Sequence, residues 1–432
     1  MSGFRDEPLF EWFLILGVLL ALFMAWGIGA NDVANAMGTS VGSGALTFRR
    51  AIIIAAIFEF AGAVLVGAHV TGTVKEGIID PTNFDADPMK FVYGMLSALL
   101  AAALWLAIAT YYSLPVSTTH SIVGAVMGFG LVALGTSGIE WPVVQKIVLS
   151  WLVSPVLGAL IAILVFLIIK KTVLEKPDPV EAARKGAPWF VFATVVIIAF
   201  SVLYKGLKNL KLDLPFALAL PYTIAIGLFV AGVVHLVLVR RRRKGEVDPD
   251  VRRMSPVSLR EKHLQVETVF GWLQIFTAIS VAFAHGANDV ANAVGPLAGI
   301  VTVAREGTVV AKAAVPFWVL VLGGVGIVIG LATYGYRVIR TIGEKITELT
   351  PTRGYAAEIA AAITILAFSR VGIPISTTHT LVGAVIGVGL ARGIPALDLK
   401  VVGRIFLSWA ATLPIAAMTA GFFYFILVRV MG

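Results

Sequence analysis

The octapeptide GANDVANA occupies residues 29–36 and returns without a change at 286–293. Two further blocks return in the same order: STTH at 117–120 and 376–379, and LSW at 149–151 and 407–409. The three offsets are 257, 259 and 258 residues. Identical blocks in one order at nearly one offset predict two homologous halves. We expect a first repeat over 1–169, a linking region over 170–266 and a second repeat over 267–432.

The composition around these blocks is that of a membrane protein. Hydrophobic residues make up 58% of the chain and charged residues 14%, against roughly 45–50% and about 25% in soluble domains. Such a chain is neither disordered nor primarily a nucleic-acid binder, despite its net charge of +9. The absence of cysteine excludes thiolate nucleophiles and cysteine-bound metals.

We predict an all-α polytopic membrane protein with about twelve transmembrane segments, some of them broken or re-entrant. The expected segments are 8–27, 48–70, 89–112, 117–135, 142–169, 187–205, 215–239, 267–285, 309–334, 354–370, 376–391 and 399–429. Equivalent segments are then separated by seven crossings, an odd number, which predicts inverted-topology repeats with a site between them. Lysine and arginine in the loop 240–266 place it in the cytoplasm, and both termini outside the cell (inner) membrane.

The repeated GANDVANA block carries polar groups into apolar surroundings. We expect it near the end or at a break of a helix, where Gly29 and Gly286 permit the unusual backbone. Its carboxylate and carboxamide oxygens suit a hard cation. Helix capping is the alternative interpretation. The residues concerned are Asn31, Asp32 and Asn35 with Asn288, Asp289 and Asn292.

The STTH blocks follow Pro115 and Pro374 and predict helix N-termini. Helix N-termini bind phosphate-like anions through free N–H groups and hydroxyls. Two of them facing each other across a pseudo-two-fold axis could hold one tetrahedral oxyanion, whereas ordinary capping is the alternative. The hydroxyls are those of Ser117, Thr118, Thr119, Ser376, Thr377 and Thr378. His120 and His379 could titrate, donate a hydrogen bond or have a supporting structural role.

Charge balance narrows the mechanism. The paired blocks contain acids but no lysine or arginine, so an anion in this low-dielectric site must be accompanied by cations. Sodium suits the oxygen ligands, and protons on the carboxylates are the competing solution. Glu59 and Glu358 lie in apolar stretches without acidic counterparts in the other half. They could add a cation or proton site, and a carboxylate facing water or a neighbouring helix is the alternative.

GANDVANA and P-x-S-T-T-H in both halves resemble the signature of the inorganic phosphate transporter (PiT) family. The resemblance covers both repeats. It implies phosphate import with sodium, or with protons or as a metal–phosphate complex. It also implies that the signature Asp and Asn residues bind substrate and cations, and that Glu59 and Glu358 are its essential intramembrane glutamates. We therefore expect phosphate at Asn35, Asn292 and the STTH hydroxyls, and sodium at Asn31, Asp32, Asn288, Asp289, Glu59 and Glu358.

The leading hypothesis is a sodium-coupled phosphate symporter that works by alternating access, not an enzyme. The alternative is a proton-coupled or metal–phosphate permease. A sulfate permease, a passive channel and an intramembrane aspartyl protease are weaker rivals, and the last needs only one pair of aspartates. We expect phosphate, sodium and the lipid bilayer as partners and no cofactor beyond the coupling ion. No nucleic acid is expected, and a homodimer is left open.

Overall fold

The computed structural model describes residues 8–67, 77–201, 203, 216–243, 259–309, 315–371 and 375–431, and in these ranges the chain is built of helices, without a β-ladder. The α-helices are α1 (Pro8–Gly42), α2 (Phe48–Val66), α4 (Pro88–Tyr111), α5 (Thr118–Leu134), α6 (Trp141–Ile169), α7 (Pro179–Ser201), α8 (Phe216–Arg243), α10 (Leu259–Asp289), α11 (Ala291–Glu306), α12 (Phe317–Thr333), α13 (Gly335–Arg340), α14 (Pro351–Val371), α15 (Thr377–Leu390) and α16 (Leu399–Met431). Short 3₁₀ or π turns lie at Pro81–Phe84, Thr136–Gly138, Lys170–Leu174, Thr341–Lys345 and Ile394–Ala396.

Among the described residues, seven helices are long and apolar enough to cross a membrane, or eight if the bent pair α12 and α13 is one span. That pair bends by 59°, and α5 and α15 are shorter apolar helices. The multi-pass, all-helical prediction is therefore confirmed. Each of the twelve expected segments coincides with a helix, but the figure of twelve crossings stays a prediction.

The first copy of GANDVANA corrects an expectation. We expected the block near a helix end or break, yet α1 continues through it as far as Gly42. Its polar side chains form hydrogen bonds with other helices, while the helical backbone continues through the block. In the second copy α10 ends at Asp289 and α11 begins at Ala291. Helix α11 occupies a stretch, 291–306, that we had left between two predicted segments.

The two halves interlock rather than pack as separate bodies. Helix α5 packs on α16 of the other half, and α15 packs correspondingly on α6. The same exchange joins α1 to α12 and α10 to α2. Corresponding helices of the two halves therefore make corresponding contacts, and the packing has an approximate two-fold relation.

Gly29 and Gly286 lie at two of these related crossings. A Cβ on Gly29 would collide with the carbonyl oxygen of Ile327 on α12, and one on Gly286 with that of Glu59 on α2. Both glycines are helical, so our expectation that they permit an unusual backbone was wrong. Their small size instead lets two helix backbones touch, as small residues do in membrane helix packing.

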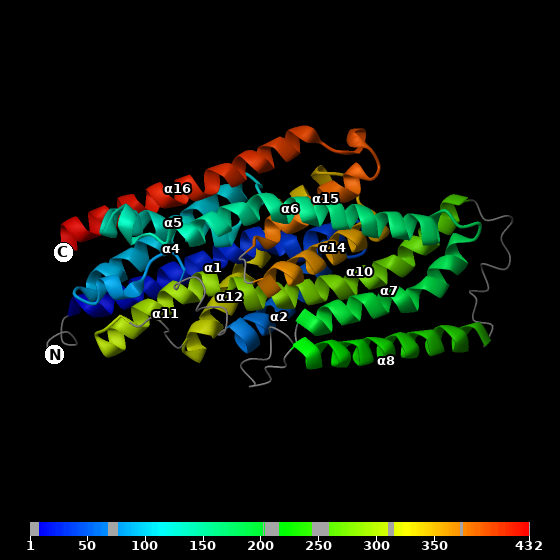
Figure 1. The fold of residues 1–432 in the computed structure, drawn as a ribbon, viewed down its shortest axis with the longest axis horizontal. Coiled ribbons are helices and arrows are strands. Elements are labelled where there is room, and N and C mark those ends of the chain that lie inside the picture. Colours follow the sequence, from blue (N-terminus) through cyan, green and yellow to red (C-terminus); the bar gives the residue numbers. More distant parts are fainter. Residues whose placement is uncertain are drawn as a thin grey trace.

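Corresponding helices run in opposite directions along the long axis of the molecule (Figure 1). Helix α6 runs from left to right in this view and α16 from right to left, and α1 and α10 differ in the same way. The start of α1 and the end of α16 lie close together. Tyr93 of α4 contacts both, since its ring packs on Phe13 and its hydroxyl donates a hydrogen bond to the Met431 carbonyl. Helices α7 and α8 lie side by side along one edge.

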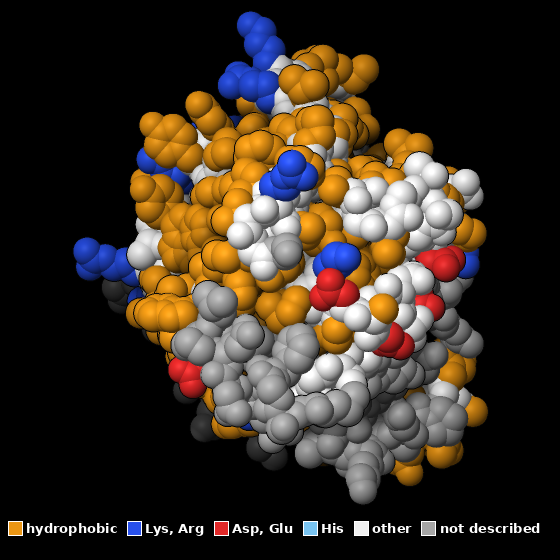
Figure 2. Space-filling view, turned by 90° about the vertical axis from the view of Figure 1, so that its left-hand side faces the viewer, with side chains coloured by type: hydrophobic (Ala, Val, Ile, Leu, Met, Phe, Trp, Pro, Cys, Tyr) orange, Lys and Arg blue, Asp and Glu red, His pale blue; other side chains and the backbone are white. Residues whose placement is uncertain are grey.

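Large apolar side chains face outward over much of the surface. On α6 the exposed positions include Leu149, Leu152, Val156, Leu160 and Leu164, which recur every three or four residues. This spacing makes one apolar stripe along the helix, as lipid contact requires. Figure 2 views the end formed by the start of α1 and the end of α16, where hydrophobic side chains dominate and charges are few.

Several predictions fall wholly or partly on residues that the structure does not describe. They are the central basic loop over 244–258, the start of the outer loop over 71–76, and Pro374 before the second STTH block. Parts of four expected segments lie outside the described residues as well, at 68–70, at 202 and 204–205, at 215 and at 310–314.

Candidate functional site

Both STTH blocks begin a helix, as predicted. The Ser117 hydroxyl accepts a hydrogen bond from the His120 N–H at 3.2 Å, and the Ser376 hydroxyl accepts one from the His379 N–H at 3.1 Å. These are N-caps for α5 and α15. The first N–H groups of each helix remain without intrahelical partners. The two blocks therefore offer equivalent sets of donors.

Hydrogen bonds across the halves bring these two helix starts together. The Asn35 amide of α1 donates to the Thr378 hydroxyl of α15 at 2.8 Å. Asn292 of α11 donates to the hydroxyls of Thr118 and Thr119 at 3.3 Å each. Each half thus supplies an asparagine to the STTH block of the other half. The Thr378 hydroxyl also donates to the Val116 carbonyl at 3.3 Å, so the two helix starts meet at the interface of the halves.

The histidines of the blocks meet behind the helix starts. The ring centroids of His120 and His379 are 4.7 Å apart. His120 packs on Trp151 at 4.2 Å, and His379 stacks on Trp409 at 3.8 Å. The tryptophans of the two LSW blocks therefore pack against the histidine pair, one on each ring. The Trp409 indole also donates a hydrogen bond to the Pro115 carbonyl at 2.9 Å. This packing supports the structural interpretation of both histidines.

Beside the asparagines lies a buried group of acids around His285. Its Nε2 lies 2.8 Å from Asp289 Oδ2 and 3.7 Å from Asp32 Oδ2, and its Nδ1 lies 3.3 Å from Glu59 Oε2. Asp32 also accepts hydrogen bonds from Thr378 at 3.0 Å and Asn35 at 3.1 Å. Glu59, which we placed in a separate site, belongs to the same group as the two aspartates. We call Asp32, Glu59, His285 and Asp289 the acidic cluster.

His285 was missed by the sequence argument, which expected no basic side chain here. It precedes Gly286, and the residue that precedes Gly29 in the other half is Ile28. Glu59 touches Gly286 where Ile327 touches Gly29. At the crossing of α1 with α12, the buried pair Ile28 and Ile327 therefore occupies the place that His285 and Glu59 occupy at the related crossing of α10 with α2. The difference between otherwise identical blocks was the signal that could have identified His285.

Apart from the His285 ring, which faces Asp32 Oδ2, Glu59 Oε2 and Asp289 Oδ2, these oxygens have no hydrogen-bond donor among the described residues, and Asn35 Oδ1 and Glu59 Oε1 have none at all. Buried acceptors are normally paired. A cation satisfies such oxygens directly, since hard cations take carboxylate and amide oxygens as ligands. In the described chain no lysine or arginine forms an ion pair with these acids.

Glu358 lies apart in a second polar group. Its carboxylate accepts hydrogen bonds from Ser40 at 3.0 Å and from the Gln274 amide at 3.2 Å, and also from the hydroxyls of Thr39 and Thr277. The acid is buried on α14, and its partners come from α1 and α10. The sequence indicated the acid itself, but not these partners, because single hydroxyls and amides in apolar helices carry no motif.

The two remaining asparagines of the blocks have different surroundings. Asn31 donates to the Thr110 hydroxyl at 2.9 Å and the Leu114 carbonyl at 3.0 Å, and accepts from the Val116 N–H at 3.0 Å. These hydrogen bonds hold the segment 114–116, which leads into α5, against α1. Asn288 is only half-buried and donates to the Ala284 carbonyl of its own helix at 2.8 Å.

Long helices with exposed apolar side chains, around a buried cluster of acids, amides and hydroxyls, define a multi-pass membrane protein with a polar interior. The family model for the phosphate transporter family matches residues 28–420. The chain belongs to the phosphate transporter family. This is a family of transporters and not of enzymes.

Similar proteins extend over nearly the whole chain. A Pyrococcus furiosus protein with the provisional name phosphate permease is 47% identical over 97% of each chain. The inorganic phosphate transporter 2-1 of Arabidopsis thaliana chloroplasts is 44% identical over 96% of this chain and 72% of its own. A solved structure described as a sodium-dependent phosphate transporter is 41% identical, with a TM-score of 0.84, and covers 97% of this chain and 100% of its own.

Proposed function

We propose that the chain is a sodium-coupled symporter that imports inorganic phosphate by alternating access. Phosphate binds between the halves, near the middle of the membrane. The observation that carries this proposal is the pair of cross-half contacts, Asn35 to Thr378 and Asn292 to Thr118 and Thr119. The Thr378 hydroxyl also donates to the Val116 carbonyl at 3.3 Å, so the starts of α5 and α15 lie side by side, where an oxyanion can receive hydrogen bonds from both.

Phosphate is bound by neutral donors. The hydroxyl and amide ligands are Ser117, Thr118, Thr119, Ser376, Thr377, Thr378, Asn35 and Asn292. The free N–H groups at the two helix starts and the positive ends of the helix dipoles add to the attraction. Because Ser117 and Ser376 already cap their helices, we assign the stronger contacts to the threonines. Thr119 and Thr377 are the least buried of the four threonines.

Sodium binds at the acidic cluster. Even with a charged imidazole, its three carboxylates retain an excess of two negative charges, and a phosphate adds one or two more. Such an excess in a low-dielectric interior requires cations, and the oxygens of Asp32, Asp289 and Glu59, which have no donor other than the His285 ring, supply their ligands. Glu358, with its ring of hydroxyls, is proposed as a further sodium site. Asn31 and Asn288 support the clusters, with Asn31 acting mainly on the approach to α5.

Twelve crossings with inverted repeats are part of the proposal. The opposite directions of α6 and α16, and of α1 and α10, support it (Figure 1). An even number of crossings also agrees with the nearness of the start of α1 to the end of α16. We place the protein in the cell membrane with both termini outside and the loop 240–266 in the cytoplasm. A homodimer remains compatible with this arrangement.

The test is uptake of radioactive phosphate into proteoliposomes with sodium and pH gradients imposed separately. Inward sodium should drive accumulation at equal pH on both sides, and dissipating the sodium gradient with an ionophore should abolish it. Uptake that ignores both gradients contradicts coupled transport. Uptake driven by the pH gradient alone selects the proton-coupled alternative.

A metal–phosphate permease is the second candidate, and one observation favours it. Ligand atoms of Asp32, His285 and Asp289 lie within 4.8 Å of one another, close enough to hold a metal ion. A ligand set of one imidazole and two carboxylates is better suited to a divalent transition metal than to sodium. Equal uptake of phosphate and Mn²⁺ in sodium-free buffer, with no phosphate uptake when the metal is removed, would establish this candidate.

A further inference from the structure

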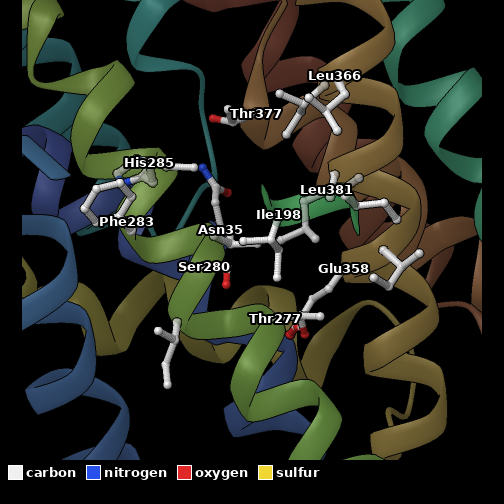
Figure 3. Close-up of a pocket in the computed structure, with 18 of the residues that line it drawn as sticks. Asn35, Ile198, Thr277, Ser280, Phe283, His285, Glu358, Leu366, Thr377 and Leu381 are labelled. Carbon is white, nitrogen blue, oxygen red and sulfur yellow. The ribbon is translucent and has the colours of Figure 1, made fainter. Parts of the chain in front are cut away.

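The linker between α4 and α5, residues 112–116, leads directly into the first STTH block. Thr118 and Thr119 of that block accept hydrogen bonds from Asn292. The proposed ligands Asn35 and Thr377 face one cavity in the close-up (Figure 3). The ligands of a binding site must be held to within about 0.5 Å of their working positions. Whatever fixes the linker therefore also fixes the phosphate donors of α5.

Helix α4 ends in a left-handed turn at Ser113. The Leu114 N–H donates to the Ala109 carbonyl at 2.8 Å, and the Ser113 N–H donates to the Thr110 carbonyl at 2.9 Å. This pair of hydrogen bonds is the pattern that closes many helices, usually around a glycine. Ser113 has a φ of 58°, and no other non-glycine residue in the described chain has a positive φ. A strained serine persists here only because its surroundings hold it.

Two side chains from the bent region after α12 hold the carbonyls on either side of this turn. Arg337 of α13 donates to the Tyr111 carbonyl at 2.7 Å, and the buried Thr341 hydroxyl donates to the Ser113 carbonyl at 2.9 Å. The carbonyl of its own helical turn lies farther from the Thr341 hydroxyl, at 3.5 Å. The Arg337 guanidinium lies 5.1, 5.4 and 5.7 Å from the centroids of three tyrosine rings, whose faces attract the cation and hold it in place.

These two donors are fixed in turn, because the turn Thr341–Lys345 touches α1 through its backbone. A Cβ on Gly42 of α1 would collide with the Gly343 carbonyl, and a Cβ on Gly343 would collide with the Gly38 carbonyl. Backbones in such close contact cannot slide past each other without separating. The donors to the linker therefore keep a constant position relative to α1, which carries Asn35.

The rest of the linker is held just as completely. Its remaining carbonyls accept hydrogen bonds from side chains of α1, α16 and α15: Leu114 from Asn31 at 3.0 Å, Pro115 from Trp409 at 2.9 Å, and Val116 from Thr378 at 3.3 Å. Pro115 has a fixed φ and restricts the residue before it. A stiff segment of this kind passes a shift at Ser113 on to the N-cap Ser117, so α5 would begin in a different place.

We propose that Arg337 and Thr341 are positioning residues for phosphate binding. Through the carbonyls of Tyr111 and Ser113 they determine where α5 begins, and with it the affinity of the first STTH block for phosphate. The inference rests on the proposed function and adds to it a role for α13, which lies outside the repeated blocks. Because both donors belong to the second half, one half adjusts the anion ligands of the other.

Equilibrium binding of radioactive phosphate to the purified protein in saturating sodium tests the role of Thr341. Thr341→Val keeps the shape of the side chain and removes the hydroxyl. It should raise the dissociation constant for phosphate at least threefold, roughly the effect of one net hydrogen bond. Thr341→Ser keeps the hydroxyl and should stay within about twofold of the wild type. Thr302→Val on α11 is the matched control, because that buried hydroxyl donates to the Ala298 carbonyl of its own helix at 2.7 Å.

Arg337 and Ser113 have comparisons of their own. Arg337→Met should weaken phosphate binding at least threefold. Arg340→Met removes the same charge from the same helix but should not weaken binding, since Arg340 pairs with Glu344 on the surface. Ser113→Gly should bind phosphate as the wild type does, because glycine adopts a positive φ readily. Ser113→Val should bind it at least threefold more weakly, because a β-branched residue disfavours that backbone.

The affinity measurement separates positioning from stability. A residue that only stabilises the fold would lower the melting temperature and the yield, while the folded protein would keep the wild-type dissociation constant for phosphate. For Thr341→Val we expect weaker phosphate binding, with the half-saturating sodium concentration at saturating phosphate unchanged. If Thr341→Val does not fold, Ser113→Val against Ser113→Gly decides in the same way. Wild-type phosphate affinity in Thr341→Val, or an equal loss in Thr302→Val, overturns the inference.

The inference and the proposed function fail differently. If the wild-type protein takes up phosphate with sodium but Thr341→Val binds phosphate normally, the positioning role is wrong and the function stands. If the wild type binds phosphate but its uptake ignores the sodium gradient, sodium coupling falls. The comparison of Thr341→Val with Thr341→Ser then still decides the positioning role.

Discussion

At the scale of single residues, the acidic cluster places three carboxylates around one imidazole with several unpaired oxygens. Asp32 and Asp289 occupy identical positions in the two blocks but have different neighbours. Asp32 accepts from Thr378 and Asn35, while Asp289 lies 2.8 Å from His285. The two aspartates are therefore not equivalent, and their replacement should affect cation binding to different degrees.

Asp32→Asn should raise the sodium concentration for half-maximal phosphate uptake by at least tenfold. A tenfold change corresponds to about 1.4 kcal/mol, below the attraction of two unit charges near 4 Å at an effective dielectric constant of 20, about 4 kcal/mol. Asp289→Asn should give a smaller shift, because His285 already contacts that carboxylate. The measurement is initial uptake against sodium concentration in proteoliposomes.

Asp87→Asn is the control, since this exposed acid pairs only with Lys90 on the surface at 3.4 Å. It should leave the sodium dependence unchanged. Wild-type sodium dependence in both Asp32→Asn and Asp289→Asn would remove the aspartates from cation coupling.

Asn31→Ala should lower stability and leave sodium affinity intact. It deletes three hydrogen bonds to Thr110, Leu114 and Val116, each with a net contribution of about 0.5–1.5 kcal/mol. We expect a loss of about 2–4 kcal/mol, observed as a lower melting temperature in detergent. Asn288→Ala removes one bond within its own helix and should lower the melting temperature less. An unchanged melting temperature with lost sodium affinity would instead make Asn31 a cation ligand.

At the scale of helices, close crossings determine which polar groups meet. Gly29 on α1 touches α12 and Gly286 on α10 touches α2 through their backbones. Gly128 on α5 and Gly387 on α15 make the related contacts with Ala417 and Ala159. Each crossing carries part of the site, because the signature blocks lie next to these glycines along the chain.

Gly29→Leu should abolish correct folding. The new side chain would occupy the place of the Ile327 carbonyl. The backbones of α1 and α12 would have to separate, which would displace the neighbouring Asp32. The matched change is Gly232→Leu on α8, where a Cβ meets nothing within 4 Å. The measurement is the fraction of detergent-extracted protein that elutes as one symmetrical peak. Equal elution of the two variants would show that the α1–α12 crossing tolerates bulk.

The helices also show where sequence reasoning ended. Apolar stretches located nearly all of the helices, because a chain in lipid must form its backbone hydrogen bonds internally. The same criterion ended the first segment at residue 27, since Asn31 and Asp32 are polar, whereas α1 continues to Gly42. Partners 79 and 346 residues away satisfy those side chains, and no local pattern encodes such distant contacts.

At the scale of the whole molecule, the two halves share one site. The repeats indicated which residues would meet at their interface, and the structure brings the STTH blocks and asparagines together. The membership of the acidic cluster was harder to predict. The sequence indicated Glu59 as an acid in an apolar stretch, but neither its place beside the aspartates nor His285, because the two residues lie on different helices of opposite halves.

Transport should carry net positive charge inward. With two or more sodium ions for each singly charged phosphate, every 100 mV of interior-negative potential favours uptake by about 2.3 kcal/mol per net charge. That is roughly a 50-fold higher accumulation for one net charge. The measurement is phosphate accumulation in proteoliposomes with the potential set by a potassium gradient and an ionophore. Accumulation independent of the potential would indicate one cation per phosphate.

The packing of α5 on α16 bears on how the protein is made. Helix α16 is translated after α5, and it supplies Trp409, whose indole donates to the Pro115 carbonyl just ahead of the first STTH block. Until then Gly128 of α5 lacks the Ala417 backbone that it contacts in the folded protein, although 264 residues lie between Leu134, the end of α5, and Leu399, the start of α16. During synthesis α5 must therefore remain without this partner until α16 has been made, and chains truncated before Leu399 should be recognised and degraded by membrane quality control.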